Sequence, residues 1–570
     1  MKTPAPVWDS WPIEDIQHVD APPTRWTAPL ALAAAAAVVW WLHPALTALP
    51  SWTAPAVAAL AVWLSIVRGI GFVFGRTRRS PHRPRLLEPG KWLLSTWSRT
   101  HTFTPQAVYA PASLDELLAV VDTCGRAGKT LKPAGSLHSW SPCAVTDSVS
   151  VQTGRLTRVL DTDLERMTIR AEAGIRMRDL YAQMERAGLA LPCLPNVDTI
   201  QLGGAIANAT HGTCIETGSM CSLVTELELV VFRPAVAEAS AGKPVSADAR
   251  ADGAAERLTL RRDTPDPHER HLFDAAVASF GSIGIIYAIT LRCVPPYHSS
   301  VTEQVQPYEQ LENRFEALAR QHYSIRFMWH PVGDMVFTKI QSPIPGPLVR
   351  PGARTILTPS DLVLIKVVAF ANERNPKRWR RLRRQLSLVL RWLVPALLPL
   401  VLQSHDKKGL LTWYDAELES RLHAAFVRHP FVNLEYAVPL TRCNDAMREL
   451  RTLFARYPAQ VMNAVGIRPV GADTAGYLAA PKDQAVAYLD LPYVAELERL
   501  GLYAEVERVC LALGGRCSWS RLICSEPREF LKNYPEHHRF VQAKRELDPW
   551  NVFSNAFSDR ICFPDDQPAV

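Results

Sequence analysis

The sequence predicts an α+β protein of at least two domains, preceded by a hairpin of two membrane-spanning helices. Three observations support this fold class. The chain has 570 residues, more than one hydrophobic core normally serves. Two apolar runs, residues 28–49 and 54–75, lie near the N-terminus, and helical and strand-like patterns alternate between residues 113 and 294.

The two apolar runs have the length and composition of membrane spans. Residues 28–49 contain no acidic residue, Lys or Arg, and residues 54–75 contain only Arg68. Five Arg residues follow within residues 76–85, so the positive-inside rule places that end in the cytoplasm. We therefore expect a multi-pass protein of the cell membrane, with the tail of residues 1–26 and the body after residue 75 both cytoplasmic. The alternative is a pair of buried, alanine-rich core helices.

The net charge of +7 is concentrated in two short segments. Residues 76–85 and 374–391 together hold thirteen basic residues and no acidic one, and the rest of the chain carries −6. The second segment overlaps the apolar residues 385–403, which predict either an interfacial helix under a basic collar or a buried helix. Anionic lipid is thus a better partner than nucleic acid. The eleven cysteines contain no Cys-x-x-Cys pair and predict free thiols without a metal site.

After a basic linker (residues 76–100), the pattern becomes mixed helix and strand. We expect helices at 113–127 and 176–187, the second closed by Gly188. We expect strands at 130–133, 166–172, 225–232 and 284–294, and a solvated loop at 234–256. The sequence past Val294 is more irregular and indicates a second domain.

Three glycine-bearing stretches carry the candidate chemistry. Glycine lets a backbone approach a ligand closely, although glycine turns are also common as purely structural features. The stretches lack both G-x-G-x-x-G and a P-loop, which argues against a Rossmann nucleotide site. The first, Lys132–Pro142, is expected to be a strand followed by a tight loop. The second, Leu202–Gly212, is expected to be a turn of small residues, and the third, Ser279–Ile286, leads into a strand.

In order and spacing, these stretches resemble the FAD domain of the vanillyl-alcohol oxidase / p-cresol methylhydroxylase (PCMH) type, most closely the aldonolactone oxidases and the covalent-flavin cholesterol oxidases. The resemblance implies a two-subdomain FAD-binding domain at residues 101–295. It also implies an α+β substrate (cap) domain at 296–570, whose C-terminal segment returns to the FAD domain. The cofactor-binding positions it implies are Pro133, Gly135, Ser136, His138, Ser139, Gly203, Gly204, Thr210, His211, Gly212, Gly284, Ile286 and Asn555.

The resemblance gives His138 the position that bonds covalently to the flavin 8α-carbon. The alternative is a loop histidine that hydrogen-bonds a phosphate or a carbonyl. His211 is expected to order its loop rather than to perform chemistry. Cys193 lies too far from the glycine pair at 203–204 for a second, cysteinyl link and is expected to be a buried thiol.

The C-terminal half resembles the aldonolactone-oxidase segments Glu-Tyr-x-x-Pro, Glu-Ile-Arg, His-Trp-x-Lys and Asp-Pro-x-x-x-Phe-x-Asn. In the implied mechanism a base takes the substrate O–H proton while hydride passes to flavin N5. Arg468 and Arg521 would be the cations that stabilise reduced flavin, unless they are solvated surface residues. The sequence departs from these segments in two places. Gly466 replaces the Glu of Glu-Ile-Arg, and Ser518 and Arg521 replace the His and the Lys of His-Trp-x-Lys. Glu435 is then the main candidate carboxylate, with a structural role as the alternative.

The sequence as a whole predicts a membrane-anchored FAD-dependent oxidoreductase. It would oxidise a CH–OH group of an aldonolactone, an alditol or a lipophilic, sterol-like alcohol, with O₂ or a membrane electron carrier as acceptor. The alternative, motivated by Gly466, is a catalytically degenerate flavoprotein that acts as a membrane-bound binding or electron-transfer partner. Nucleic-acid binding ranks lowest, because both basic segments adjoin apolar runs and lack an aromatic stacking platform.

Overall fold

The computed structural model describes residues 85–88, 91–234, 247–331, 333–345, 407–413, 432–457, 464–493 and 501–564. The predicted hairpin at 28–49 and 54–75 and the basic, apolar segment at 374–403 lie outside these ranges. None of the helices within them is long and apolar enough to cross a membrane. The membrane hairpin therefore stays a prediction.

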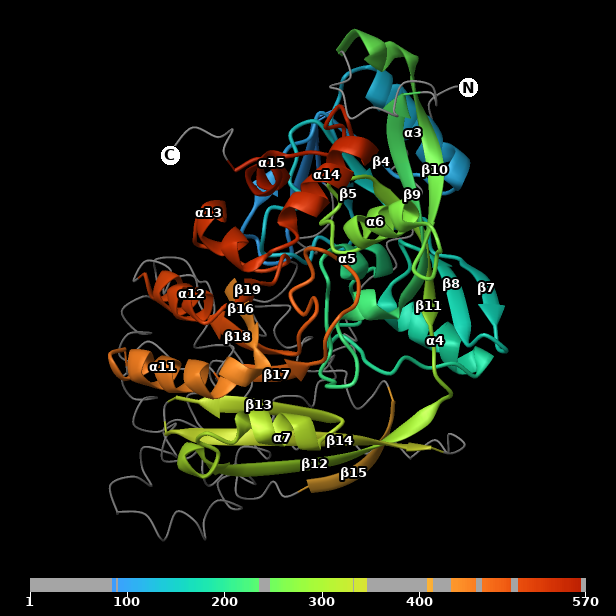
Figure 1. Ribbon diagram of the computed structural model, residues 1–570. Coiled ribbons are helices and arrows are strands. Elements are labelled where there is room, and N and C mark those ends of the chain that lie inside the picture. The colour runs from blue at the N-terminus through green and yellow to red at the C-terminus, as the bar shows by residue number, and fades with distance from the viewer. Residues whose placement is uncertain are drawn as a thin grey trace, which may run out of the picture. The chain divides into compact units, whose positions relative to one another are not determined.

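A small parallel sheet with one helix follows the first antiparallel strands (Figure 1). Helix α3 (Leu114–Arg126) begins after Ser113, whose hydroxyl accepts a hydrogen bond from the Glu116 N–H at 3.2 Å. The helix and strand predicted at 113–127 and 130–133 are thus confirmed to within about a residue. The antiparallel strands are β1 (Arg85–Glu88), β2 (Lys91–Ser95) and β3 (Thr102–Phe103), and the parallel sheet has the order β4 (Ala107–Tyr109), β6 (Val149–Gln152), β5 (Leu131–Ala134).

A five-stranded antiparallel sheet packs with α3 and with three helices from its own part of the chain. Its order is β10 (Gly253–Arg261), β9 (Val224–Pro234), β11 (Ile285–Arg292), β8 (Thr168–Glu172) and β7 (Val159–Asp163). The helices are α4 (Met177–Ala187), α5 (Leu202–Ala207) and α6 (Pro267–Ala276). Helix α4 ends at Gly188 with φ of 74°, a left-handed conformation that favours glycine, as predicted.

Two local expectations were wrong. The loop predicted at 234–256 contains a 3₁₀ turn (Ala247–Asp252) and the start of β10, which pairs with β9 from Gly253↔Pro234 onward. Its alanines and glycine carry no alternating pattern, so pairing with β9 decides the strand. The turn expected around Gly203–Gly204 is helix α5, where Gly203 permits close packing because an added Cβ would lie 2.9 Å from the Ala173 Cβ.

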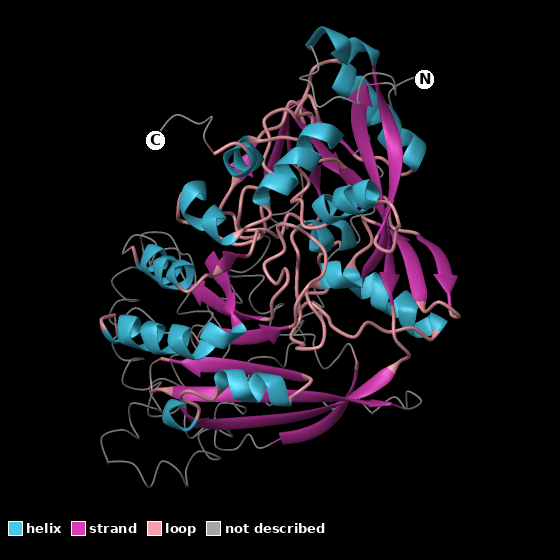
Figure 2. Ribbon diagram, viewed as in Figure 1, coloured by secondary structure: helices cyan, strands magenta, loops and turns pink. Residues whose placement is uncertain are grey.

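The second half is built on an eight-stranded antiparallel sheet, which the sequence pattern past Val294 did not reveal (Figure 2). Helices α7 (Phe315–Gln321), α11 (Cys443–Ala455) and α12 (Leu502–Ala512) pack on it. The strand order is β15 (Lys407–Thr412), β12 (Tyr297–Pro307), β14 (Met335–Pro345), β13 (Ser324–His330), β17 (Val465–Val470), β18 (Val486–Tyr493), β16 (Val432–Pro439) and β19 (Arg516–Cys517).

The C-terminal segment lies against the first half of the chain (Figure 1). It contains α13 (Pro527–Phe530), α14 (His537–Leu547) and α15 (Ala556–Cys562). Val552 and Phe553 are fully buried in the core of the parallel sheet, and the Val552 carbonyl accepts a hydrogen bond from Leu131 N–H of β5 at 2.7 Å. The buried Lys132 ammonium donates to the carbonyls of Gly281 at 3.0 Å and Phe553 at 3.2 Å. The C-terminus therefore fixes the ends of the first and third glycine stretches.

Candidate active site

Alternation along β16, β17 and β18 gives the eight-stranded sheet one apolar and one polar face. On β16, Leu434 and Tyr436 are buried in the core, and the Tyr436 hydroxyl donates to Glu507 of α12. Side chains alternate between the two faces of a strand, so Glu435 lies on the opposite face. The register aligns Glu435 with Asp490 of β18, and Asp490 with Gly466 of β17.

Glu435 joins three parts of the chain. Its Oε1 lies 3.2 Å from Nε2 of His211, in the second glycine stretch, and its Oε2 lies 3.2 Å from Nε of Arg521, beyond β19. The side chain is only 1% exposed, so both oxygens depend on these partners. The His211 ring stacks on Tyr488 with centroids 3.4 Å apart, and its Nδ1 lies 3.0 Å from the Gly212 carbonyl oxygen.

The electrostatics of this cluster favour a charged carboxylate. Burial alone would raise the pKa of Glu435, but Arg521, His211 and Arg468 together hold that pKa well below its ordinary value. Burial lowers the pKa of the His211 imidazole, against the opposing influence of Glu435. Both groups are thus held in place by partners, which fits the expectation that His211 orders its loop.

Arg468 on β17 is buried and bonded to the first half of the chain. Its Nε donates to Thr213 Oγ1 at 3.1 Å, and one Nη donates to Asn196 Oδ1 at 3.1 Å and to the His211 carbonyl at 3.3 Å. Arg326 on β13 donates to the same Asn196 oxygen at 2.6 Å. Arg468 is therefore an interior cation between the two halves rather than a solvated surface residue.

Arg521 connects this cluster to the loop that contains His138. Its guanidinium lies 4.6 Å from the centroid of the Trp140 ring, a cation–π contact. His138 stacks on Trp97 with centroids 4.8 Å apart, and its ring lies 6.2 Å from that of Trp140. His138 is partly exposed, so one part of its ring remains accessible while the tryptophans fix its orientation.

The three glycine stretches meet in space. Ser136 Oγ donates to the Thr199 carbonyl at 2.8 Å, just before the second stretch. Phe280 N–H donates to the Ala207 carbonyl at 2.7 Å, which joins the third stretch to α5. Gly281 has φ of +66°, and an added Cβ there would lie 2.7 Å from Pro133. Residues far apart in the sequence thus form one backbone-lined region.

This region has features that fit a bound cofactor. Gly204 is exposed, and an added Cβ would meet no atom within 4 Å. Among the described residues, the buried Asn208 Oδ1 and Ser279 Oγ have no hydrogen-bond partner. Unpartnered buried polar atoms beside open backbone are what a polar ligand would satisfy.

Other predicted cofactor positions serve to pack this region. An added Cβ at Gly212 would lie 2.3 Å from Cys193 Sγ, and one at Gly135 would lie 2.6 Å from Gln201 Oε1. Cys193 is buried, as expected. The Asn555 amide donates to the carbonyls of Pro142 at 3.0 Å, Cys143 at 3.3 Å and Val145 at 2.8 Å, so it holds the loop after His138.

The remaining predicted positions lie in the same region. Gly284 precedes β11, where an added Cβ would lie 2.8 Å from both Leu229 and the Val230 carbonyl. Ile286 is buried in β11. Thr210 N–H donates to the Ala205 carbonyl at 2.8 Å, and Ser139 is partly exposed beside His138.

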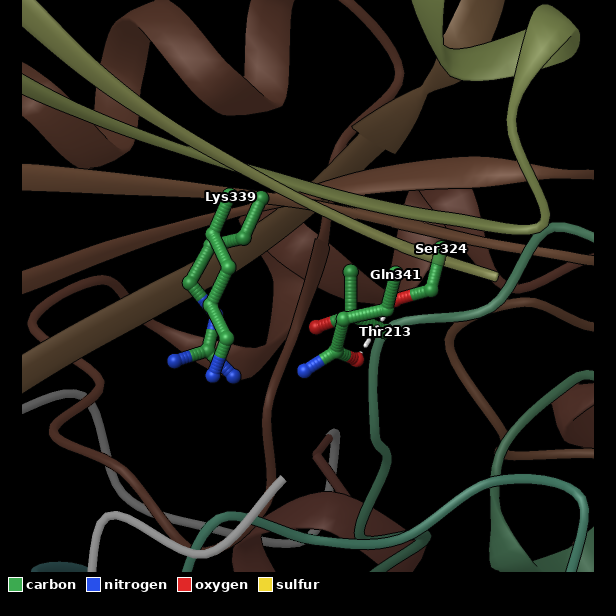
Figure 3. A pocket seen from close by; sticks show the side chains of 5 residues that line it. Thr213, Ser324, Lys339 and Gln341 are labelled. Atoms are coloured by element: carbon green, nitrogen blue, oxygen red, sulfur yellow. Dashed lines mark hydrogen bonds between the residues drawn. The ribbon is translucent and has the colours of Figure 1, made fainter. Parts of the chain in front are cut away.

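A small polar depression opens on the polar face of the sheet. Figure 3 shows Lys339 and Gln341 projecting from β14 toward the segment that carries Thr213. The residues that line this polar depression are Thr213, Ser324, Arg326, Lys339 and Gln341. Two cationic side chains, two hydroxyls and an amide suit a ligand rich in oxygen atoms.

Comparison with known proteins agrees with this geometry. Residues 105–233 match a family model described as FAD binding domain, and residues 289–561 match one described as D-arabinono-1,4-lactone oxidase. The mouse L-gulonolactone oxidase is 24% identical over 484 residues, 82% of this chain and 97% of the relative. The L-gulono-1,4-lactone dehydrogenase of Mycobacterium tuberculosis is 22% identical over 82% of this chain and 99% of the relative.

The chain is a PCMH-type FAD flavoprotein close to the aldonolactone oxidases. It is an FAD-dependent oxidoreductase. Its fold is shared with a cholesterol oxidase from B. sterolicum, with a TM-score of 0.63 and 14% identity over 85% of this chain and all of that one. A solvent-stable cholesterol oxidase gives a TM-score of 0.64 and 18% identity over 84% of this chain and all of that one.

Several residues of this flavoprotein's site were missed in the sequence. Asp490 and Asn196 carry no motif, and only the alternation of β18 could have placed Asp490 on the polar face. Trp97 and Trp140 flank His138 from two different segments. Lys132 is the first residue of the first glycine stretch. Its place within an apolar strand could have predicted that its ammonium group is buried.

Replacing Glu435 with glutamine tests the cluster. Because Arg521 and His211 lose their charged partner, we expect the free energy of unfolding at neutral pH to fall by about 2–4 kcal/mol, measured by denaturant unfolding of the holoenzyme. The lowered pKa means that Glu435 stabilises the fold above the ordinary Glu pKa of 4.5 and loses this effect as the pH falls below it. The difference between wild type and Glu435→Gln should therefore shrink in acid.

The matched control for that variant is Glu316→Gln, at a surface pair with Arg320 on α7. It should change the unfolding free energy by less than about 0.5 kcal/mol. Equal effects of the two substitutions would contradict the role assigned to Glu435.

Proposed function

We propose that this flavoprotein oxidises a CH–OH group of a hydroxyl-rich lactone or polyol. The observation that carries the proposal is the polar face of the eight-stranded sheet. There Arg326 and Lys339 line a small polar depression together with Thr213, and Arg468 donates to the same Thr213. Lactone oxidation is also the activity in the names of the relatives from mouse and M. tuberculosis.

The residues of the site fall into three roles in this proposal. The region around Gly204, with Asn208 and Ser279, holds the FAD, which when bound supplies the hydride acceptor. Arg468 and Arg521 provide positive charge where negative charge develops during the reaction. Glu435 keeps His211 and Arg521 oriented, because both of its oxygens are occupied by these partners.

The polarity of the pocket distinguishes between the substrate classes predicted from the sequence. A steroid buries mainly hydrocarbon, which gains nothing from two cations, two hydroxyls and an amide. The cholesterol oxidases share the fold at 14% and 18% identity, a likeness that carries no substrate with it. A sugar-derived lactone or alditol fits this lining better than a sterol-like alcohol.

We propose further that FAD is bound covalently through His138. The ring is held by stacking on Trp97 and lies close to Trp140, yet it stays partly exposed. Such fixation pre-orients one imidazole edge toward a ligand. The degenerate alternative, a flavoprotein without activity, rests on Gly466 alone.

Anchoring to a membrane belongs to the same proposal. The two apolar runs at 28–49 and 54–75 and the Arg residues at 76–85 support it. A cytoplasmic catalytic body beside the bilayer has access to O₂ and to a membrane electron carrier as acceptors.

A substrate screen tests the activity. Washed membranes and the soluble fraction from expressing cells are incubated anaerobically with aldonolactones, alditols or sterols, and flavin absorbance is followed before O₂ or a quinone is admitted. We expect lactones or alditols to bleach the flavin of the membrane fraction. Adding the effective electron acceptor should then restore the flavin absorbance. Bleaching by sterols alone would contradict the substrate class, and bleaching by no compound would favour the degenerate alternative.

The covalent link has its own test. After denaturing electrophoresis, the wild-type band should show flavin fluorescence and the His138→Ala band should be dark. His101→Ala is the control, because His101 binds the Trp140 carbonyl with its Nε2 at 3.0 Å and belongs to the same aromatic region. A dark wild-type band, or a fluorescent His138→Ala band, would refute attachment at this residue.

A further inference from the structure

Asp490 occupies the centre of a row of three residues on the polar face. In the register of the sheet it lies opposite Glu435 on one side and opposite Gly466 on the other. Residues directly opposite in an antiparallel pair have neighbouring side chains on the same face. The row therefore contains two carboxylates and one position without a side chain.

The carboxylate of Asp490 lies directly beside Gly466, which has no side chain. A Cβ added to Gly466 would lie 3.3 Å from Asp490 Cβ and 3.8 Å from its Oδ2. Gly466 and Asp490 are both partly exposed, whereas Glu435 is 1% exposed. Of the two carboxylate residues in the row, Asp490 is the more exposed, although its Oδ1 is buried.

The hydrogen bonding of Asp490 is incomplete. Asn433 of β16 interacts with the carboxylate, but Oδ1 is buried and has no hydrogen-bond partner among the described residues. A buried carboxylate oxygen without a hydrogen-bond donor is energetically unfavourable. A hydroxyl group of a bound molecule would satisfy it. In contrast, Glu435 Oε1 lies 3.2 Å from His211 Nε2, and its Oε2 forms an ion pair with Arg521 at 3.2 Å.

The charges around Asp490 are balanced. Glu435 acts on it as a neighbouring anion, and Arg521 and Arg468 act as cations. Burial, followed by the Glu435 charge, raises the pKa of Asp490 above its ordinary value. A hydroxyl donor placed against this carboxylate would lie next to the same two cations that the proposed function assigns to the reaction.

We propose that Asp490 is the substrate-binding carboxylate of this enzyme and accepts a hydrogen bond from a substrate hydroxyl beside Gly466. In this chain the carboxylate thus comes from β18, while the neighbouring position on β17 carries glycine. The inference rests on the proposed function, because it needs a hydroxyl-bearing substrate.

Anaerobic flavin reduction by the lactone or alditol that bleaches the wild-type holoenzyme tests the proposal. The dependence of the rate on substrate concentration gives an apparent Kd and a limiting rate. Asp490→Asn keeps the shape and removes the charge, so we expect the apparent Kd to rise about 10-fold or more with FAD content unchanged. The exposed Asp483→Asn, the same change on the preceding loop, should stay within twofold of wild type.

A pH series separates binding from a structural role. The apparent Kd of the wild type should increase as the pH falls through the pKa of Asp490, because the carboxylate gains a proton. The Asp490→Asn variant should lose this dependence. A Kd within twofold of wild type, or an unchanged pH dependence, would overturn the proposal.

A reciprocal exchange covers the case in which Asp490→Asn does not retain FAD. Gly466→Glu/Asp490→Gly returns a carboxylate to the row from β17 and relieves the 3.3 Å contact. It should bind substrate more tightly than Asp490→Gly alone, and failure to do so would overturn the proposal.

No bleaching of the wild type by any substrate would overturn the proposed function, and this inference with it. Bleaching of the wild type with an unaffected Asp490→Asn would overturn only the inference.

Discussion

The ion-pair cluster at Glu435 is the interaction on which the arrangement of the site depends. A carboxylate that is 1% exposed must have partners, because an unpaired buried charge is strongly destabilising. Its partners, His211 and Arg521, come from the second glycine stretch and from the loop after β19. These contacts thereby fix the positions of the polar face of the sheet, the FAD-binding half and the His138 loop relative to one another.

That constraint separates two kinds of polar group on the same face. Both carboxylate oxygens of Glu435 contact protein side chains, and Arg468 donates hydrogen bonds to Thr213 and Asn196. Asp490 differs, because its Oδ1 has no hydrogen-bond partner among the described residues. The C-terminal segment adds a second level of support: Lys544 donates to the Ser282 carbonyl and to Asp548, both at 2.8 Å, and so steadies the third glycine stretch from α14.

Much of the first half could be predicted from local patterns, and much of the second could not. Local sequence signals mark several elements of this half. Ser113 caps helix α3, Gly188 ends helix α4, and Gly281 has the positive φ that favours glycine. The pairing of β10 with β9 and the row Glu435, Asp490, Gly466 depend on long-range register, which no local pattern encodes. The motif resemblance indicated Arg468, Arg521 and Glu435 as candidates, but only the structure shows that Glu435 is enclosed and that Asp490 is partly exposed beside it.

A double-mutant cycle on His211→Asn and Arg521→Met tests the central claim most directly. If both residues act through the one carboxylate of Glu435, their effects on the unfolding free energy of the holoenzyme should be coupled by about 0.5–3 kcal/mol. If the two losses instead add within about 0.3 kcal/mol, the cluster does not act as a unit and the account of the site is contradicted.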